Sequence, residues 1–173
     1  FGTNHNFLCL VRAGVVAGES QSPELPVQCA QNLFDNDFRG RIYAFDPVSG
    51  QIKLRFVSPT VSALLSDGTR VDLARDAGYR TMTSFTEPDG TKALYVGTFT
   101  SGDLPQPAAR LLRSTDGRNF TEVPIEGDFA SRVRSYRSLT VFNGRLYVIA
   151  LTSGDEGSIV LEASDPASGA FEV

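Results

Sequence analysis

The sequence is poor in several residue types that commonly carry catalysis or binding. His5 is the only histidine, and with no partner residue near it in the sequence it gives little support to histidine-based catalysis. Lys53 and Lys92 are the only lysines, the arginines are scattered, and the net charge is −4. This charge gives no electrostatic reason to expect nucleic acid or an anionic membrane as a partner. No apolar run reaches the roughly 18 residues that a membrane-spanning helix needs, so we expect no membrane insertion.

Cysteine is also scarce. Cys9 and Cys29 bracket a loop rich in Gly, Pro, Ser and Gln. A disulfide between them would stabilise the fold by roughly 3 kcal/mol outside the cytoplasm. The alternative is two free thiols, with Cys9 as a small core residue of an apolar strand. No second Cys/His pair completes a metal site, and no phosphate loop, nucleotide fold or haem-attachment motif is present. We therefore expect no metal and no cofactor. The possible disulfide fits an extracytoplasmic location, which we also expect.

What is present is a succession of short apolar strands separated by turns. Strands with alternating apolar residues run into turns such as Asn143-Gly144, and Asn-Gly is the strongest short hairpin signal in a sequence. A smaller hairpin over 61–73 is predicted to turn at Asp67-Gly68. No segment shows convincing helical periodicity. The sequence therefore predicts an all-β protein built from antiparallel hairpins.

The strands repeat along the chain. YRTMTSF at 79–85 matches YRSLTVF at 136–142, and ALYVGTFTSGD at 93–103 matches RLYVIALTSGD at 145–155. A third hairpin recurs as YAFDPVSGQI, LLRSTDGRNF and LEASDPASGAF. Each unit is predicted to contain strands A, B and C, an Asp-containing turn and strand D, in about 45 residues. That period and strand number are typical of a β-propeller blade.

The repeat predicts the organisation of the whole chain as one propeller domain. Residues 1–57 are predicted to form an incomplete blade with strands B, C and D and an inserted loop at 14–34. Residues 58–78 are a connecting hairpin, 79–125 a complete blade, 126–135 a connector and 136–173 a second complete blade. Phe1 aligns with Phe85 and Phe142, the last residues of strand A. Propellers usually need four to eight blades to close. About three four-stranded antiparallel blades are too few, so we expect a fragment of a larger propeller, or closure by other blades or chains.

The turns between strands C and D resemble the Asp boxes of sialidase-like β-propellers. Ser114-Thr115-Asp116-Gly117-Arg118-Asn119-Phe120 is the nearest match, with the glycine one place early and Phe in place of the usual Trp. The turn at Asp165, with Gly169 and Phe171, is a looser match, and the turn from Asp46 to Ile52 equally resembles the blade turns of quinoproteins. In that family the Asp is structural, and Asp side chains commonly satisfy backbone donors in turns. We therefore interpret Asp46, Asp116 and Asp165 as structural residues.

Two arginines are the candidate ligand-binding residues. Arg80 and Arg137 hold the same place in successive units, at the start of strand A, preceded by Tyr79 and Tyr136. The resemblance implies that inner strands line a central channel, where sialidases hold a substrate carboxylate with arginines from several blades. Arginine suits this role because its guanidinium can donate two parallel hydrogen bonds to a carboxylate. The alternative is that each arginine forms an ion pair within the repeat and that both tyrosines are packing residues.

Asp35-Asn36-Asp37-Phe38-Arg39-Gly40 partly resembles a calcium loop, but Arg39 falls where an oxygen ligand is needed, which favours an ordinary Asn- and Asp-rich turn. For function, we expect a non-catalytic propeller module that acts as a scaffold or binds a protein or carbohydrate, with the 14–34 loop as its contact element. A carbohydrate-active enzyme of the sialidase-like type, binding an anionic group through Arg80 and Arg137, is the alternative.

Overall fold

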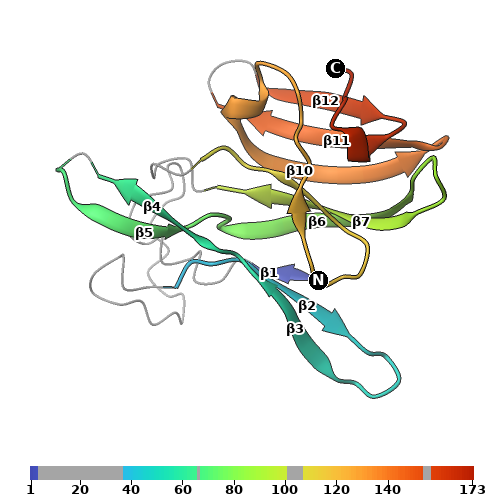
Figure 1. The fold of residues 1–173 in the computed structure, drawn as a ribbon, viewed down its shortest axis with the longest axis horizontal. Coiled ribbons are helices and arrows are strands. Elements are labelled where there is room, and N and C mark those ends of the chain that lie inside the picture. The colour runs from blue at the N-terminus through green and yellow to red at the C-terminus, as the bar shows by residue number, and fades with distance from the viewer. Residues whose placement is uncertain (4–36, 66, 101–106, 154–156) are drawn as a thin grey trace.

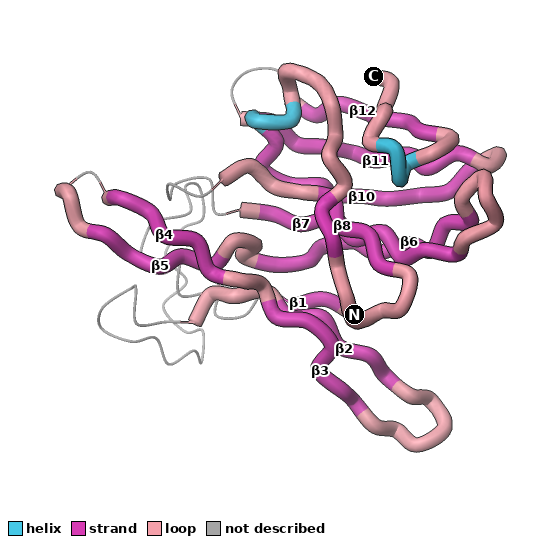
Figure 2. Tube along the Cα trace, in the orientation of Figure 1, coloured by secondary structure: helices cyan, strands magenta, loops and turns pink. Residues whose placement is uncertain are grey.

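The chain folds as antiparallel β-sheets with almost no helix, as the sequence predicts (Figure 1). The structure is a computed structural model that describes residues 1–3, 37–65, 67–100, 107–153 and 157–173. Helical backbone in these ranges is limited to two short 3-10 turns, η2 (Ala130–Arg132) and η3 (Pro166–Ser168), both near the C-terminal strands (Figure 2). No helix in the described residues is long and apolar enough to cross a membrane.

The strands form a three-stranded sheet, a two-stranded hairpin and a seven-stranded sheet, and we describe the last as two parts because a single pair of residues joins them. We call them the N-terminal sheet, the β4–β5 hairpin, the central sheet and the C-terminal sheet. The N-terminal sheet contains β1 (Gly2–Thr3), β2 (Arg41–Phe45) and β3 (Ile52–Val57), and the hairpin contains β4 (Thr60–Leu64) and β5 (Arg70–Ala74). The central sheet contains β6 (Gly78–Thr86), β7 (Lys92–Phe99), β8 (Leu111–Ser114) and β9 (Thr121–Glu122). The C-terminal sheet contains β10 (Val133–Phe142), β11 (Arg145–Thr152) and β12 (Ser158–Ala163).

The predicted hairpin turns are present. Asn143 and Gly144 both have positive φ, 47° and 72°, as a two-residue hairpin turn between β10 and β11 requires. The turn between β4 and β5 contains Asp67, whose carboxylate accepts a hydrogen bond from the Thr69 amide, and Gly68 at a φ of 84°. Local turn chemistry therefore sets the hairpin register, as expected from the sequence.

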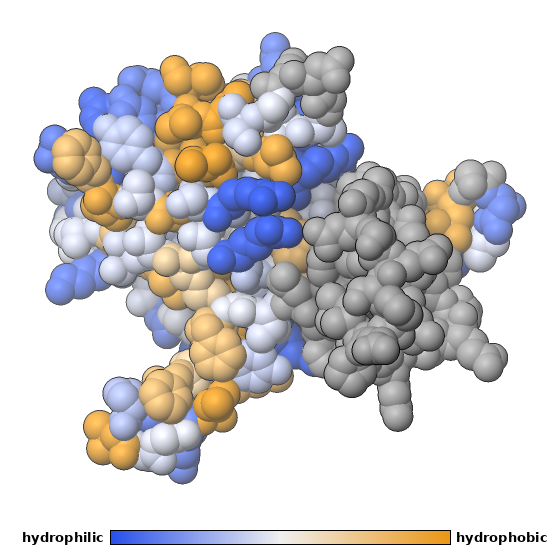
Figure 3. Space-filling model, turned by 180° about the vertical axis from the view of Figure 1, so that it is seen from behind, coloured by the Kyte–Doolittle hydropathy of each residue, from blue (hydrophilic) through white to orange (hydrophobic). Residues whose placement is uncertain are grey.

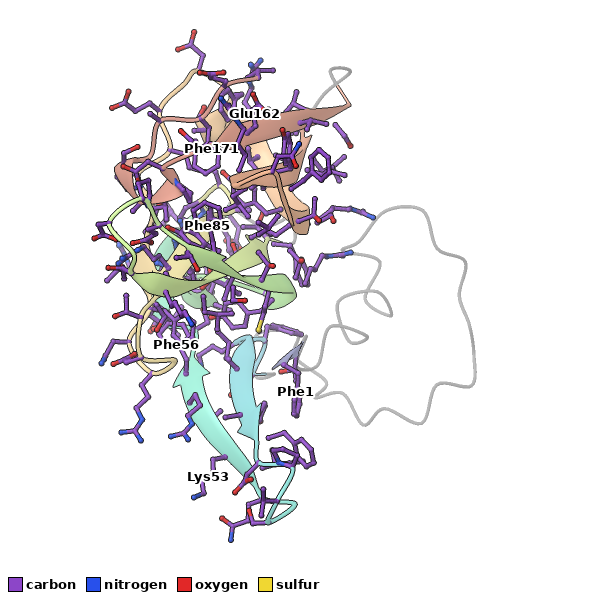
Figure 4. The ribbon with its side chains drawn as sticks, turned by 90° about the vertical axis from the view of Figure 1, so that its right-hand side faces the viewer. Phe1, Lys53, Phe56, Phe85, Glu162 and Phe171 are labelled. Carbon is purple, nitrogen blue, oxygen red and sulfur yellow. The ribbon has the colours of Figure 1, made fainter. Side chains whose placement is uncertain are left out.

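The three sheets pack against one another through their faces. Phe85, Tyr95 and Leu111 of the central sheet share a buried cluster with Leu139, Val148 and Leu161 of the C-terminal sheet. Tyr79, Val96 and Leu112 on the other face of the central sheet cluster with Ile42 of the N-terminal sheet. Figure 4 shows Phe56 between the N-terminal and central sheets and Phe85 between the central and C-terminal sheets. The only strand pairing between the central and C-terminal sheets in the described residues is that of Ser135 with Phe99.

Residues 1–3 are placed differently from the sequence prediction. We expected Phe1 to end strand A, but Gly2 and Thr3 pair directly with Ile42 and Arg41 of β2, the predicted strand C. Residues 1–3 therefore correspond to β7, the predicted strand B, and not to strand A. Gly2 pairs with Ile42 of β2 as Gly97 of β7 pairs with Leu111 of β8, so Phe1-Gly2-Thr3 aligns with Val96-Gly97-Thr98. Three residues carried too little sequence pattern for this match to stand out.

Other boundaries shift by a few residues. β6 begins at Gly78 and β10 at Val133, slightly before the predicted Tyr79 and Tyr136. In the last unit the predicted strand D is reduced to a single β-bridge between Glu162 and Glu172. Glu172 follows η3 in the chain. The predicted strand over 7–11, the 14–34 loop, His5, Cys9 and Cys29 lie outside the described residues.

Candidate functional site

Arg80 and Arg137 occupy matching β-bulges in adjacent sheets. On β6, Tyr79 pairs with Thr98 and Thr81 pairs with Gly97, which leaves Arg80 without an opposite residue. On β10 the same shift between the partners of Tyr136 and Ser138 leaves Arg137 unpaired. Bulges often re-aim a side chain and are enriched next to active sites. The sequence placed the two arginines in equivalent positions, but it carried no visible sign of the bulges.

The guanidinium group of Arg80 lies in the electrostatic field of Arg137. The guanidinium of Arg80 lies over the ring of Phe99, with its carbon 4.5 Å from the ring centroid, and both arginine side chains remain exposed. Partial burial lowers the pKa of Arg80, and the positive charge of Arg137 lowers it further. Within the described residues neither guanidinium forms an ion pair with a carboxylate. The arrangement concentrates positive charge where an anion would relieve the repulsion.

Two buried hydroxyl groups lie near the same junction between the central and C-terminal sheets. Ser135 pairs with Phe99, the residue beneath Arg80, and the Thr100 amide donates to the Arg134 carbonyl oxygen. The side-chain oxygens of Thr100 and Ser135 are both buried and have no hydrogen-bond partner in the described structure. A buried polar atom without a partner is uncommon and is frequently explained by function. Sequence reasoning did not identify these two residues.

Tyr79 and Tyr136 do not join this cluster. Both side chains are buried, and Tyr79 donates a hydrogen bond from its hydroxyl to the carboxylate of Asp76 at 3.1 Å. Burial is the largest cause of a raised pKa for both phenols, and in Tyr79 the negative charge of Asp76 raises the pKa further. Their position inside the sheet interfaces fits the packing alternative that the repeat suggested.

The three turn aspartates differ in how they bond. The Asp116 carboxylate accepts hydrogen bonds from the amides of Arg118 and Asn119, and these bonds, that of Asn119 first, hold its pKa far below the usual value. Asp46 accepts from the Val48 amide and the Ser49 hydroxyl. At Asp165 the acceptor is the main-chain carbonyl oxygen, which bonds the amide and hydroxyl of Ser168. All of these contacts satisfy hydrogen-bond donors of the turns themselves.

Asp76 is a fully buried carboxylate with several hydrogen-bond partners, and sequence reasoning missed it. It is 0% exposed, and Arg110 donates two hydrogen bonds to it, Nε to Oδ1 at 2.9 Å and Nη2 to Oδ2 at 2.8 Å. The Asp76 amide also donates to the Ser58 hydroxyl. Burial tends to lower the pKa of Arg110, but the bonds and charge of Asp76 outweigh it and raise the pKa. This cluster joins the β4–β5 hairpin to the central sheet.

Glu87 forms a second buried ion pair, in the turn between β6 and β7. Arg113 of β8 donates to both carboxylate oxygens at 2.6 Å, and the Tyr95 hydroxyl donates to Oε1 at 2.6 Å. The Arg113 bonds are the main cause that lowers the pKa of Glu87 below 4.5. The turn, strand β7 and strand β8 are thus tied together at one carboxylate.

This pair predicts an acid-sensitive contribution to stability. Because the folded pKa of Glu87 is lowered, its contribution is present above the unfolded pKa and is lost as the pH falls through the folded value. We expect Glu87→Gln to lower the free energy of unfolding at pH 7 by about 1–2 kcal/mol. Wild type and variant should converge as the pH is lowered below about 4. Urea unfolding at a series of pH values measures this, with exposed Glu126→Gln as control. A constant difference at all pH values would contradict it.

The described residues hold no group of three or more His, Cys, Asp and Glu side chains that could bind a metal ion. Asp37 bonds Arg39 and Arg41 instead, with Nε of Arg39 at 2.9 Å and Nη2 of Arg41 at 2.7 Å. The preceding residues of the calcium-like stretch, Asp35 and Asn36, lie outside the described ranges. No known protein family matches the chain, and no curated protein matches it significantly. The arginine pair therefore has to be judged on its geometry.

Proposed function

We propose that this chain is part of a β-propeller that acts as a non-catalytic binding module and holds an anionic group between Arg80 and Arg137. The observation that carries the proposal is the matched pair of bulged arginines, which lie close enough for one charge to lower the pKa of the other. The sheet repeat supports the propeller part, because successive antiparallel sheets pack face to face through equivalent positions. An extracytoplasmic location belongs to the same proposal.

The chemistry of the pair favours a carboxylate or a sulfate. Two guanidiniums can each donate paired hydrogen bonds to the oxygens of such a group. An acidic sugar meets these requirements, and a carbohydrate ligand is also what the resemblance to sialidase-like propellers implies.

Catalysis would require more than the arginines. A glycosidase needs carboxylic acid groups on both sides of the bond that it cleaves. The residues that follow β7 and β11 contain the repeated Ser-Gly-Asp sequence, with Asp103 and Asp155, and both lie outside the described ranges. The first residues of β6 and the last residues of β7 lie at the same end of the central sheet, because Gly78 pairs with Phe99. The enzyme is the second candidate because Asp103 follows this end of β7 in the sequence.

Neutralising each arginine tests the binding proposal. We expect the wild-type chain to bind N-acetylneuraminate or glucuronate, and Arg80→Gln or Arg137→Gln to weaken binding at least roughly tenfold, because each change removes charged hydrogen bonds. Arg118→Gln is the matched control, since Arg118 is an exposed arginine in a turn of the central sheet. Isothermal titration calorimetry gives the affinities.

Two results would contradict the proposal. One is the absence of binding by wild type to both acids, and the other is equal binding by all four proteins. Release of a chromogenic group from an aryl sialoside by wild type, abolished in both arginine variants, would instead favour the enzyme.

A further inference from the structure

Phe99, the last residue of β7, is paired with both of the strands that carry the arginines. It pairs with Gly78 of β6 and with Ser135 of β10. Gly78 lies two residues before Arg80, and Ser135 lies two residues before Arg137. The pair with Ser135 is also the one that joins the central and C-terminal sheets within the described ranges. The backbone at Phe99 therefore fixes where the two arginine strands begin relative to each other.

The side chain of Phe99 contacts one of the two guanidiniums. Cζ of Arg80 lies 4.5 Å from the centroid of the Phe99 ring, inside the roughly 6 Å limit of a cation–π contact. The Phe99 side chain is only 2% exposed, whereas Arg80 is exposed. The guanidinium thus lies over a ring that is otherwise enclosed by the protein.

This ring opposes the two effects that disfavour a cation at Arg80. Partial burial and the charge of Arg137 both lower the pKa of Arg80, and both would be relieved if its side chain turned away into solvent. The face of an aromatic ring carries partial negative charge and attracts a cation above it. Phe99 therefore favours the placement of the charge that burial and repulsion work against.

The matching place in the C-terminal sheet has no aromatic ring. Leu151 of β11 is the equivalent of Phe99 in the sequence repeat, and it pairs with Ser135 as Phe99 pairs with Gly78. A leucine side chain can pack against a guanidinium but does not attract its charge. The two arginines therefore share a backbone position but differ in what lies beneath them.

We propose that Phe99 is the positioning residue of the anion site and holds Arg80 in place before the ligand arrives. This role rests on the anion binding proposed above. An arginine that is ordered only on binding loses rotamer freedom at that step, which weakens the complex. Arg80 avoids this loss, and Arg137 supplies the second guanidinium. Both arginines are exposed, and Figure 3 shows strongly hydrophilic side chains gathered where the central and C-terminal sheets meet.

Phe99→Leu tests the role, because it gives the central sheet the residue that the C-terminal sheet has at this place. We expect it to weaken binding of N-acetylneuraminate or glucuronate roughly fivefold, through loss of the cation–π contact. In an Arg80→Gln background the same change should alter the affinity less than about twofold, since the side chain that Phe99 positions is already gone. Isothermal titration calorimetry on the four proteins gives this double-mutant cycle.

Phe85→Leu is the matched control for packing. It makes the same change at a phenylalanine that is 3% exposed, near the other end of β6 from Arg80. Circular dichroism should show both leucine variants folded. Phe85→Leu should leave the affinity within about twofold of wild type, because the two sites do not share a contact. If it weakens binding as much as Phe99→Leu does, looser packing explains the loss and the role of Phe99 is wrong.

Nuclear magnetic resonance tests the contact in the free protein. A proton above the face of an aromatic ring resonates upfield, so the Nε–H proton of Arg80 should lie upfield of that of exposed Arg118. The signal is assigned by its absence in Arg80→Gln, and Phe99→Leu should return it to the position of an exposed arginine. This measurement on the wild-type protein stands even if the leucine variant fails to fold.

The two proposals can fail separately. If wild type binds neither acid, the proposed function fails, whereas a ring-shifted Arg80 proton would still support the placement of Arg80 by Phe99. Equal affinities of wild type and Phe99→Leu, an undiminished loss in the Arg80→Gln background, or an unshifted Arg80 proton would each overturn the role of Phe99 and leave the anion site itself in place.

Discussion

Asp76→Asn is expected to destabilise the protein by about 3–5 kcal/mol, because it removes the negative charge from a buried ion pair and leaves the other partner in place. Asp76 is fully buried, and the side chain of Arg110 is only 14% exposed. The amide of the variant keeps the size of the carboxylate but cannot balance the guanidinium. Glu122 is the other acid near Arg110, 3.7 Å away, but it is half exposed and compensates only in part. Since small domains are stable by about 5–15 kcal/mol, the loss is a large share of the total.

Urea unfolding followed by circular dichroism measures this loss. Asp72→Asn is the matched control, because Asp72 lies four residues earlier, in β5, with an exposed side chain. A second variant separates charge imbalance from loss of packing: Asp76→Leu combined with Arg110→Met removes both charges of this pair and should recover part of the stability. The recovery is partial because Arg75, 3.9 Å from Asp76, also loses its partner. If Asp76→Asn costs no more than Asp72→Asn, the cluster does not stabilise the fold as described.

The hairpin turns and the repeat could be predicted because each depends on a short local sequence pattern. Asn143-Gly144 specifies a hairpin turn whatever surrounds it, and the similarity of YRTMTSF to YRSLTVF is enough to align β6 with β10. Leu139 is buried and Thr140 is exposed, as alternation along a strand requires. Such signals depend on neighbours within a few residues, and the all-β fold follows from them.

The features that escaped prediction depend on distant residues. Asp76 and Arg110 are 34 positions apart, and nothing in either neighbourhood marks them as partners. The bulges at Arg80 and Arg137 appear only when the register of two strands is known. The sequence could therefore nominate the two arginines as equivalent, but it could not show that the backbone sets both side chains apart from the regular strand pattern. The buried hydroxyls of Thr100 and Ser135 escaped for the same reason.

Gly97→Val is expected to destabilise the protein by about 3 kcal/mol, since the added side chain overpacks the interface between the central and C-terminal sheets. A Cβ atom at Gly97 would lie 2.6 Å from the Tyr136 carbonyl oxygen and 2.8 Å from Cγ2 of Thr81. The first of these atoms belongs to the backbone, so no side-chain rotation relieves the contact. β10 would have to move away from the central sheet as a unit.

The smaller change Gly97→Ala is the more decisive measurement, because two effects oppose each other. Glycine within a strand costs conformational entropy, so alanine would stabilise by roughly 0.5–1 kcal/mol if the site had space for it. We expect the opposite sign in urea unfolding. Ile149→Ala is the matched control at the same repeat position, where the side chain is exposed and the change should be small. A stabilised Gly97→Ala protein would contradict the close contact. A destabilised one should also bind the acidic sugar less well, because a displaced β10 carries Arg137 away from Arg80.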